Sequence, residues 1–338
     1  MSTRTLALVE SPTQLLNVAE WAHASGATDG LRIVVLAPRD PQTVRQLNRV
    51  SALVTGALSL AVRIRDVRTG PAGALVGAAQ VLGELARAQR LVIGDPFSRF
   101  IQTLLPAWTA DDVVIVDDGT ATWHFARCIE DELPLVRWGR PVAGSPRRAT
   151  RAGRLLSPSL SRSLTVFSCL AEATPIGARA LANRYEWTRS TRRPDIIDDQ
   201  VDILGVSLVG TGLVERDAYL DAVGRLSRGA AAVRYIAHRR EPEEMLAEIG
   251  RLPGVTLQRF DLPVELALRH GPVARRIITF PSTAAHTLPV VLSDVPARIE
   301  VQRIEPSWFT PEATVQARAF VARIADAAPP PRPVLEIA

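Results

Sequence analysis

Two adjacent carboxylates and a glycine, Asp117-Asp118-Gly119, follow the most apolar run in the first half of the chain, Val113 to Val116. An acid held in an apolar setting at a strand end has a raised pKa and can act as a general base. Two alternatives remain open: an Asp-Gly turn with Asp118 bonded to the backbone, and a pair of metal ligands. The metal interpretation lacks a nearby histidine or further acids to complete an octahedral site.

A histidine beside two arginines, His238-Arg239-Arg240, follows a later apolar run, Val233 to Ile236. A protonated histidine donates to phosphate, and arginine clamps it in a bidentate geometry. The pattern therefore predicts a phosphate site. The alternative is a basic surface loop that leads into a helix.

Polar residues at two further helix starts suit a nucleotide. Ser282 and Thr283 follow the run ending at Phe280, where hydroxyls and free amides form an anion site. Ser282 can equally act as a plain N-cap. Glu265, two residues after Pro263, favours the helix dipole or accepts bonds from two ribose hydroxyls.

Two loops of the first half end in helix-start patterns and are expected to face the same site from the acceptor side. Ser11 suits an N-cap and Pro12 the first helical position, while Arg99 is placed to meet an acidic sugar. A turn followed by a helix cap is the alternative for the second loop. The acceptor-side candidates are Ser11, Pro12, Gln14, Asp95, Ser98, Arg99 and Gly119.

Short apolar runs alternate with helical patterns along the first half, which predicts βαβ units and a parallel sheet. The predicted strands are 5–9, 32–37, 61–67, 90–93, 113–116 and 164–167. The predicted helices begin near Pro12, Pro41, Gly73, Ser98 and Thr174. An arginine-rich segment of about 137–163, punctuated by prolines and glycines, is expected to be a long excursion loop.

The second half repeats the alternation and predicts a sheet of its own. Its predicted strands are 201–205, 233–236, 255–258, 276–280 and 297–301, and its helices begin near Asp217, Pro242, Pro263, Thr283 and Pro311. We therefore predict two doubly wound α/β domains, 1–190 and 195–327, facing a central cleft, and a disordered tail at 328–338.

Composition narrows the classes of function. The chain has 338 residues, 47% of them hydrophobic and 22% charged, and no apolar run long enough to span a membrane. No lysine occurs, which excludes a Schiff base and a Walker-type lysine. Two cysteines fit a reducing compartment, so we expect a cytoplasmic protein.

Seven arginines and no acid lie between Leu133 and Ala171, which favours either a solvated loop or contact with an anionic membrane.

Taken together, these segments resemble the bacterial polysialyltransferase and lipooligosaccharide sialyltransferase group over nearly the whole chain. The resemblance is collective rather than due to one motif. The segments that occur in the family's order are 9–17 (VESPTQLLN), Gly94-Asp95 with Ser98-Arg99-Phe100, Asp117-Asp118-Gly119, 204–209 (LGVSLV), His238 with Arg240-Glu241, Pro263-Val264-Glu265, and Ser282-Thr283. Where the family has proline after the histidine, this chain has Arg239.

The resemblance implies a GT-B fold of two Rossmann-like domains and an inverting, metal-independent transfer from a CMP sugar. It implies that Asp117, or else Asp118, deprotonates the acceptor hydroxyl, and that His238 protonates or neutralises the leaving phosphate. Ser282 and Thr283 would assist, and Glu265 would hold the ribose. Arg239, which departs from the family's pattern, is a candidate phosphate contact from its residue type alone. The loop of Gly205 and Ser207 would lie beside the nucleotide.

Such a transfer needs stabilisation of negative charge on a phosphate and removal of one proton from a nucleophile, and these residues supply both. No cofactor is required. The expected partners are a CMP-sugar donor, a glycan or glycolipid acceptor, and an anionic membrane contacted peripherally at the inner face. A non-catalytic GT-B-like protein that binds a nucleotide or glycan is the alternative. Nucleic-acid binding through the arginine-rich segment would require steeply salt-dependent affinity and has little other support.

Overall fold

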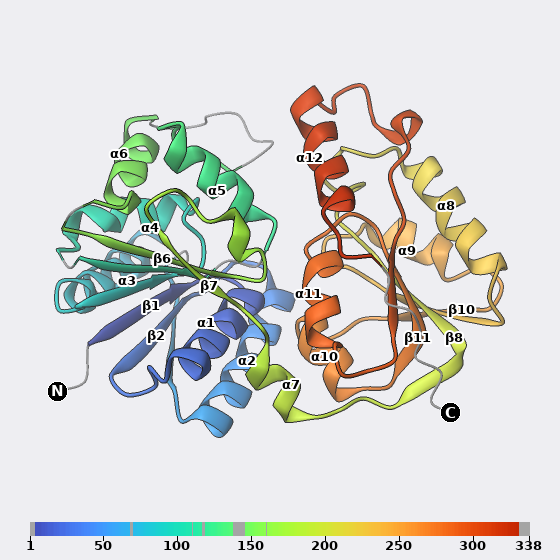
Figure 1. Cartoon of the computed structure of the whole chain (residues 1–338), viewed down its shortest axis with the longest axis horizontal. Helices are drawn as coiled ribbons and strands as arrows, with labels where there is room; N and C mark the ends of the chain where they lie inside the picture. The colour runs from blue at the N-terminus through green and yellow to red at the C-terminus, as the bar shows by residue number, and fades with distance from the viewer. Residues whose placement is uncertain are drawn as a thin grey trace. The chain divides into compact units, whose positions relative to one another are not determined.

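A computed structural model describes residues 4–67, 70–109, 111–116, 119–137, 146–159 and 161–330, apart from the side chains of 70–75 and 171. The chain divides into two compact units, Met1–Trp187 and Thr188–Ala338, called here the first and second domains (Figure 1). Helix α7 (Glu186–Thr191) spans the point where the chain divides.

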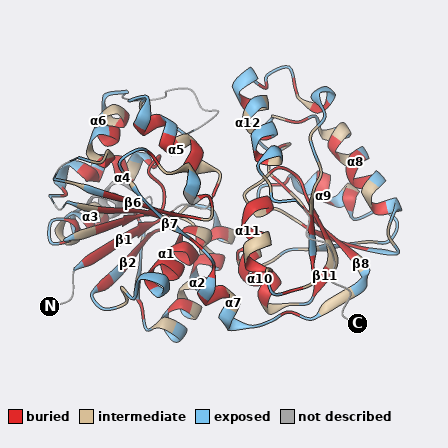
Figure 2. Ribbon diagram, viewed as in Figure 1, coloured by how far each residue is buried: buried red, intermediate tan, exposed pale blue. Residues whose placement is uncertain are grey.

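The first domain is built on a parallel sheet with strand order β3-β2-β1-β4-β5-β6-β7. Its strands are β1 (Thr5–Val9), β2 (Leu31–Leu36), β3 (Ala61–Arg65), β4 (Arg90–Ile93), β5 (Asp112–Val116), β6 (Ser163–Ser168) and β7 (Arg179–Ala182). Every residue of β1 is buried, and most residues of β2, β4 and β5 are buried too (Figure 2). Strands covered by helices on both faces show this continuous burial.

The helices of the first domain connect successive strands. They are α1 (Pro12–Ser25), α2 (Pro41–Leu58), α3 (Gly70–Leu85), α4 (Arg99–Leu104), α5 (Ala121–Glu130) and α6 (Pro146–Leu156). Ser11, Asp40 and Ser98 each accept a hydrogen bond from a backbone N–H three residues later, which starts α1, α2 and α4. Local capping chemistry therefore sets where these helices begin.

The second domain has a parallel sheet of order β10-β9-β8-β11-β12. Its strands are β8 (Ile196–Leu204), β9 (Ala232–Ile236), β10 (Val255–Gln258), β11 (Val273–Thr279) and β12 (Arg298–Val301). Its helices are α8 (Arg216–Arg228), α9 (Glu243–Ile249), α10 (Val264–His270), α11 (Ala284–Val291) and α12 (Val315–Asp326). The strand order reverses between β8 and β11, and doubly wound sheets bind ligands at the carboxyl ends of strands flanking such a point.

Both sheets have the strand order of doubly wound Rossmann-like domains, so the predicted fold class is confirmed in each. Two such domains in one chain are the components of the GT-B fold. That the two sheets face a common cleft stays a prediction.

The predicted arginine-rich excursion loop at 137–163 is wrong in part, because it contains helix α6. Ala149, Ala152, Gly153 and Leu156 are buried at helical spacing, while the arginines between them point to the other face. Small apolar residues among many arginines make this pattern weak in the sequence. Residues 138–145 and 160 lie outside the described part of the chain, and contact with an anionic membrane stays a prediction.

The helix predicted near Thr174 is also wrong. The chain turns there and forms the edge strand β7, which pairs with β6. Gly177 has φ 81°, in the left-handed region that favours glycine, and this turn follows directly after Pro175. A proline and a glycine this close together interrupt a helix.

In the part of the chain that is described, no helix is both long and apolar enough to cross a membrane. Most of the predicted disordered tail, from residue 331 onward, lies outside the described residues.

Candidate functional site

The turn after β9 folds around His238. Its backbone N–H donates to Glu241 Oε2 at 2.6 Å, and the Glu241 N–H donates to the His238 carbonyl at 3.0 Å. The Arg240 N–H donates to His238 Nδ1 at 3.2 Å. Because Nδ1 accepts this bond, the ring proton of neutral His238 lies on Nε2, which is the nitrogen left to donate to a ligand.

Glu241 is the centre of a buried polar network. The Tyr235 hydroxyl donates to Glu241 Oε1 at 2.5 Å, and the Tyr219 and Tyr235 hydroxyls lie 2.8 Å apart. All three side chains are buried, and they come from α8, β9 and the turn after β9. Glu241 belongs to one of the segments that resemble the family, but no role for it is predicted from the sequence.

Gly205, the first residue after β8, makes room for this network. A Cβ at this position would lie 2.1 Å from Glu241 Oε2, far inside contact distance. Farther along the same loop, a Cβ at Gly210 would lie 2.6 Å from the Arg240 carbonyl oxygen. The loops that follow β8 and β9 are therefore closely packed, with Gly205 against the Glu241 side chain and Gly210 against the Arg240 backbone.

Burial sets the charges of this turn. It raises the pKa of Glu241 to about 7, although the hydrogen bonds from Tyr235 and the His238 N–H act in the opposite direction. Burial also lowers the pKa of His238 to about 4, and the charges of Arg239 and Arg240 lower it further. Between about pH 4.5 and 6.5 the folded protein holds a proton on Glu241 and leaves His238 neutral, the reverse of the order in an unfolded chain.

We expect Glu241→Gln to change how stability depends on pH. The raised pKa of Glu241 stabilises the native state at low pH, and this contribution is lost between about pH 4.5 and 7. The lowered pKa of His238 acts oppositely, adding stability as pH rises from about 4 to 6.5. Without Glu241, the free energy of unfolding should therefore rise relative to wild type by up to about 3 kcal/mol from pH 4.5 to 7.

Urea denaturation at several pH values measures this difference. The matched control is Glu243→Gln, which removes an exposed carboxylate from the first turn of α9. Parallel pH curves for wild type and Glu241→Gln would contradict the reversed order of protonation.

The loop after β11 supplies hydroxyls at the start of α11. The Thr279 hydroxyl donates to the Phe280 carbonyl, so Ser282 Oγ, 3.2 Å away, donates to Thr279 Oγ1. Thr283 is the N-cap residue of α11 and makes no side-chain capping bond. Plain N-capping by Ser282 is therefore not observed. Donation to a phosphate requires the Ser282 hydroxyl to rotate.

Three of the predicted nucleotide segments follow adjacent strands of one sheet. His238, Gly205 and Ser282 come after β9, β8 and β11, and β8 lies between the other two. Ser207 belongs to the loop of Gly205, and its carbonyl accepts from the Thr211 N–H at 2.9 Å. Residues far apart in sequence are thus brought to the carboxyl edge at the point where the strand order reverses.

Glu265 lies on α10, buried to 3% exposure, and accepts a bond from Thr287 Oγ1 of α11 at 2.8 Å. This bond joins the two helices. Contact with a ribose stays a prediction, because one carboxylate oxygen is already engaged with Thr287.

In the first domain, several predicted acceptor-side residues have structural roles. Ser11 caps its helix as predicted, and Ser98 caps its helix as the alternative for the second loop states. Gln14 Oε1 accepts from the Glu10 N–H at 2.8 Å. Asp95 is buried, accepts from the Phe97 N–H at 2.9 Å, and pairs with Arg137. The partnership with Arg137 is absent from the sequence-based predictions because the two residues are 42 positions apart.

The other three acceptor-side candidates differ in exposure and backbone conformation, and Pro12 is buried. Arg99 is exposed at the start of α4, and Pro12 occupies the start of α1. Gly119 has φ 118°, a conformation that favours glycine, just before α5. Asp117 and Asp118 lie outside the described residues, so their roles as base and their distance to any other group stay predictions.

A scan of protein-family models and a search of curated proteins found no match. Solved structures show distant similarity. UDP-GlcNAc 2-epimerase from Methanocaldococcus jannaschii is 9% identical, covering 96% of this chain and 92% of its own, with TM-score 0.47. E. coli heptosyltransferase WaaC with ADP-2-deoxy-2-fluoro heptose is 12% identical, and the similarity covers 94% of this chain and 99% of WaaC with TM-score 0.45. Acinetobacter baumannii MurG is 13% identical, and the similarity covers 95% of this chain and 91% of MurG with TM-score 0.38. At TM-scores below 0.5 these similarities establish neither an activity nor a donor.

Proposed function

We propose that the protein is an inverting, metal-independent glycosyltransferase that moves sialic acid or a related nonulosonic acid from a CMP donor to a glycan acceptor. The observation that carries the proposal is the convergence of His238, Gly205 and Ser282 after three adjacent strands at the reversal point of the second sheet. Sites of this kind bind nucleotides in doubly wound domains.

The leaving group of such a donor is a phosphate that gains negative charge as the bond to the sugar breaks. His238 Nε2–H donates to it, and Arg239 adds a positive charge in the same turn. A phosphate beside the ring raises the pKa of His238 from its low value, because an opposite charge favours the imidazolium form. The proposed role of His238 is therefore to stabilise the charge that develops on the phosphate through its Nε2–H, while Nδ1 keeps the bond from the Arg240 N–H.

Inversion requires direct attack by the acceptor hydroxyl, and attack requires a base. Asp117, with Asp118 as the alternative, is proposed for this role on the acid-acid-glycine motif after β5. Ser282 and the loop of Gly205 and Ser207 are proposed to hold the CMP phosphate, and Glu265 its ribose. The site is proposed to act in the cytoplasm, where CMP sugars would be its substrates.

Calorimetric titration of the full chain with CMP in the presence of a chelator tests the donor assignment. We expect micromolar binding, weakened at least about tenfold in His238→Ala because the principal donor to the phosphate is lost. His23→Ala, which removes an exposed histidine at the end of α1, is the matched control and should bind as wild type does. Absence of CMP binding in the wild type would overturn the donor assignment.

An activity assay on the same preparation distinguishes a glycosyltransferase from a non-catalytic nucleotide-binding protein. With a CMP-nonulosonate donor and an acceptor glycan, Asp117→Asn should lose turnover while CMP binding is kept, because the residue acts on the acceptor. Wild-type protein that binds CMP yet turns over none of several CMP-nonulosonate donors would favour a non-catalytic nucleotide-binding protein.

A further inference from the structure

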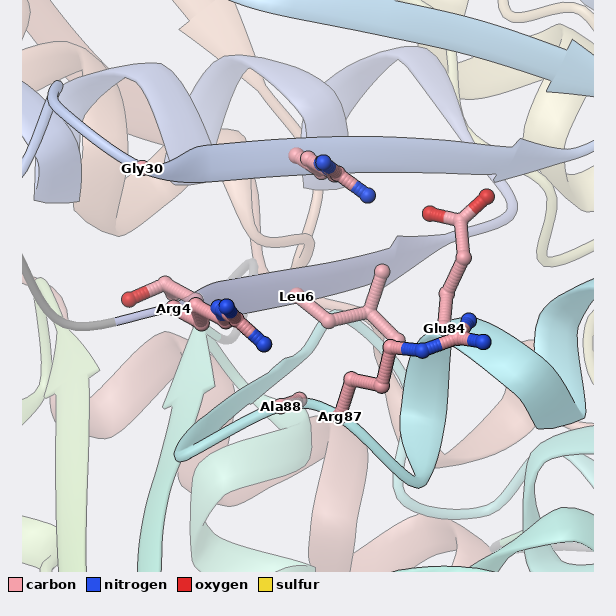
Figure 3. A pocket seen from close by; sticks show the side chains of 8 residues that line it. Arg4, Leu6, Gly30, Glu84, Arg87 and Ala88 are labelled. Carbon is pink, nitrogen blue, oxygen red and sulfur yellow. The ribbon is translucent and has the colours of Figure 1, made fainter.

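A cavity of about 490 Å³ opens at the amino-terminal edge of the first sheet (Figure 3). Arg4, Leu6 and Arg32 line it from the beginnings of β1 and β2, and Glu84, Arg87 and Ala88 line it from the end of α3 and the turn that follows. The predicted acceptor-side loops follow the opposite ends of the strands, and β1 alone is roughly 16 Å long. The cavity is therefore distinct from the site proposed above.

Sheet register and helix packing create this cavity. Leu6 of β1 pairs with Arg32 of β2, and register partners on parallel strands face the same side of the sheet. Leu85 and Ala88 belong to the same buried cluster as Leu6, so the end of α3 covers this side. The Arg87 guanidinium donates to the Gly83 carbonyl at 2.9 Å, which holds the side chain beside the helix end.

The cavity carries an excess of positive charge. Within the described residues, none of Arg4, Arg32 and Arg87 has a carboxylate within ion-pair distance. Glu84 is the one acid of the lining, and its Oε1 already lies 3.5 Å from Arg63 of β3. Residues 1–3, which precede Arg4, are Met, Ser and Thr and contain no acid. Three guanidinium groups thus line a space whose one carboxylate, that of Glu84, is already paired with Arg63.

We propose that this cavity binds a sugar-sized anion, a saccharide that carries a phosphate or a carboxylate group. Guanidinium groups bind both anions through paired N–H donors. The floor of Leu6 and Ala88 is apolar and buried, which suits the carbon face of a saccharide better than a fully hydrated inorganic ion. Glu84, whose side chain is only 13% exposed and pairs with Arg63, borders the cavity as its one acid. The volume falls within the usual range for small-molecule sites.

The role of the site is to hold an acidic saccharide away from the reacting groups. Binding of the saccharide does not depend on the CMP assignment, because no residue of the cavity takes part in the loops after β8, β9 or β11. The role in holding an acceptor rests on the proposed glycosyltransferase function. An acidic glycan bound here would raise the local concentration of acceptor without touching the chemistry.

Titration of the full chain with four probes tests the proposal: N-acetylneuraminic acid, glucose 6-phosphate, inorganic phosphate and glucose. We expect one or both acidic sugars to bind at millimolar or lower concentration, more tightly than phosphate, and glucose not to bind. The first two probes tell a carboxylate site from a phosphate site. Arg4→Gln/Arg32→Gln should weaken that binding at least about tenfold, because two of the three cationic donors are lost.

Arg45→Gln removes one exposed guanidinium from α2 of the same domain and is the control for loss of surface charge outside the cavity. It should leave binding within about twofold of wild type, since long-range charge effects are screened by salt. His238→Ala should also retain acidic-sugar binding, which separates this cavity from the proposed donor site. Both altered arginines are exposed, and thermal denaturation checks that the double variant folds. Equal binding by wild type and double variant, or no binding of any acidic sugar, would overturn the proposal.

Discussion

Gly205→Ala is expected to cost the second domain about 3 kcal/mol of stability and to weaken CMP binding at least about tenfold. The new methyl group would lie 2.1 Å from Glu241 Oε2 and 2.7 Å from its carboxyl carbon. Glu241 cannot keep its place, so the Tyr235 hydroxyl and the His238 N–H lose their buried acceptor. Overpacking and an unsatisfied buried donor each cost about 1–3 kcal/mol.

A double-mutant cycle identifies the clash. In a Glu241→Ala background the carboxylate is gone, so adding Gly205→Ala should cost little further stability. Gly224→Ala in α8 is the control, because its nearest neighbours lie 3.8 and 4.0 Å away and alanine favours a helix. If Gly205→Ala costs the same with and without Glu241, close approach to this carboxylate is not what requires the glycine.

Asp202→Asn is expected to lower the stability of the second domain by about 3–5 kcal/mol, because it leaves a buried arginine without its counter-charge. Asp202 on β8 is completely buried and pairs with Arg234 of β9 through two hydrogen bonds of 2.8 and 2.5 Å. The Ala274 N–H of β11 donates to the same carboxylate at 2.9 Å. One side chain thereby ties together the three strands whose ends carry the proposed nucleotide loops.

Urea denaturation followed by hydrogen exchange of peptides from β8 and β11 measures the loss in the second domain itself. Asp198→Asn is the control, because Asp198 lies on the same strand and pairs with Arg275 at the surface. Exposed pairs contribute about 0–1 kcal/mol, so this variant should remain close to wild type. A loss below 1 kcal/mol for Asp202→Asn would mean that neighbouring groups compensate for the missing charge.

Much of the fold follows from local patterns. The strands at 5–9, 90–93 and 255–258 are predicted with their observed bounds, because short apolar runs between helix-start signals are typical of buried parallel strands. Pro12 and Pro41 mark two predicted helix starts that the structure confirms. Helix α6 is missed because its buried residues are mostly alanine and glycine, whose contribution to apolar periodicity is small.

For the candidate site too, some features follow from the sequence and others only from the tertiary structure. The sequence by itself determined which residue types follow each strand, and since parallel strands end at one edge, it also placed His238, Gly205 and Ser282 on a common edge. It could not reveal the approach of Glu241 to Gly205, the pairing of Asp95 with Arg137, or the gathering of Arg4, Arg32 and Arg87. Those contacts join residues far apart in the chain. They depend on strand order, register and how closely the backbones pack, and only the tertiary structure decides these.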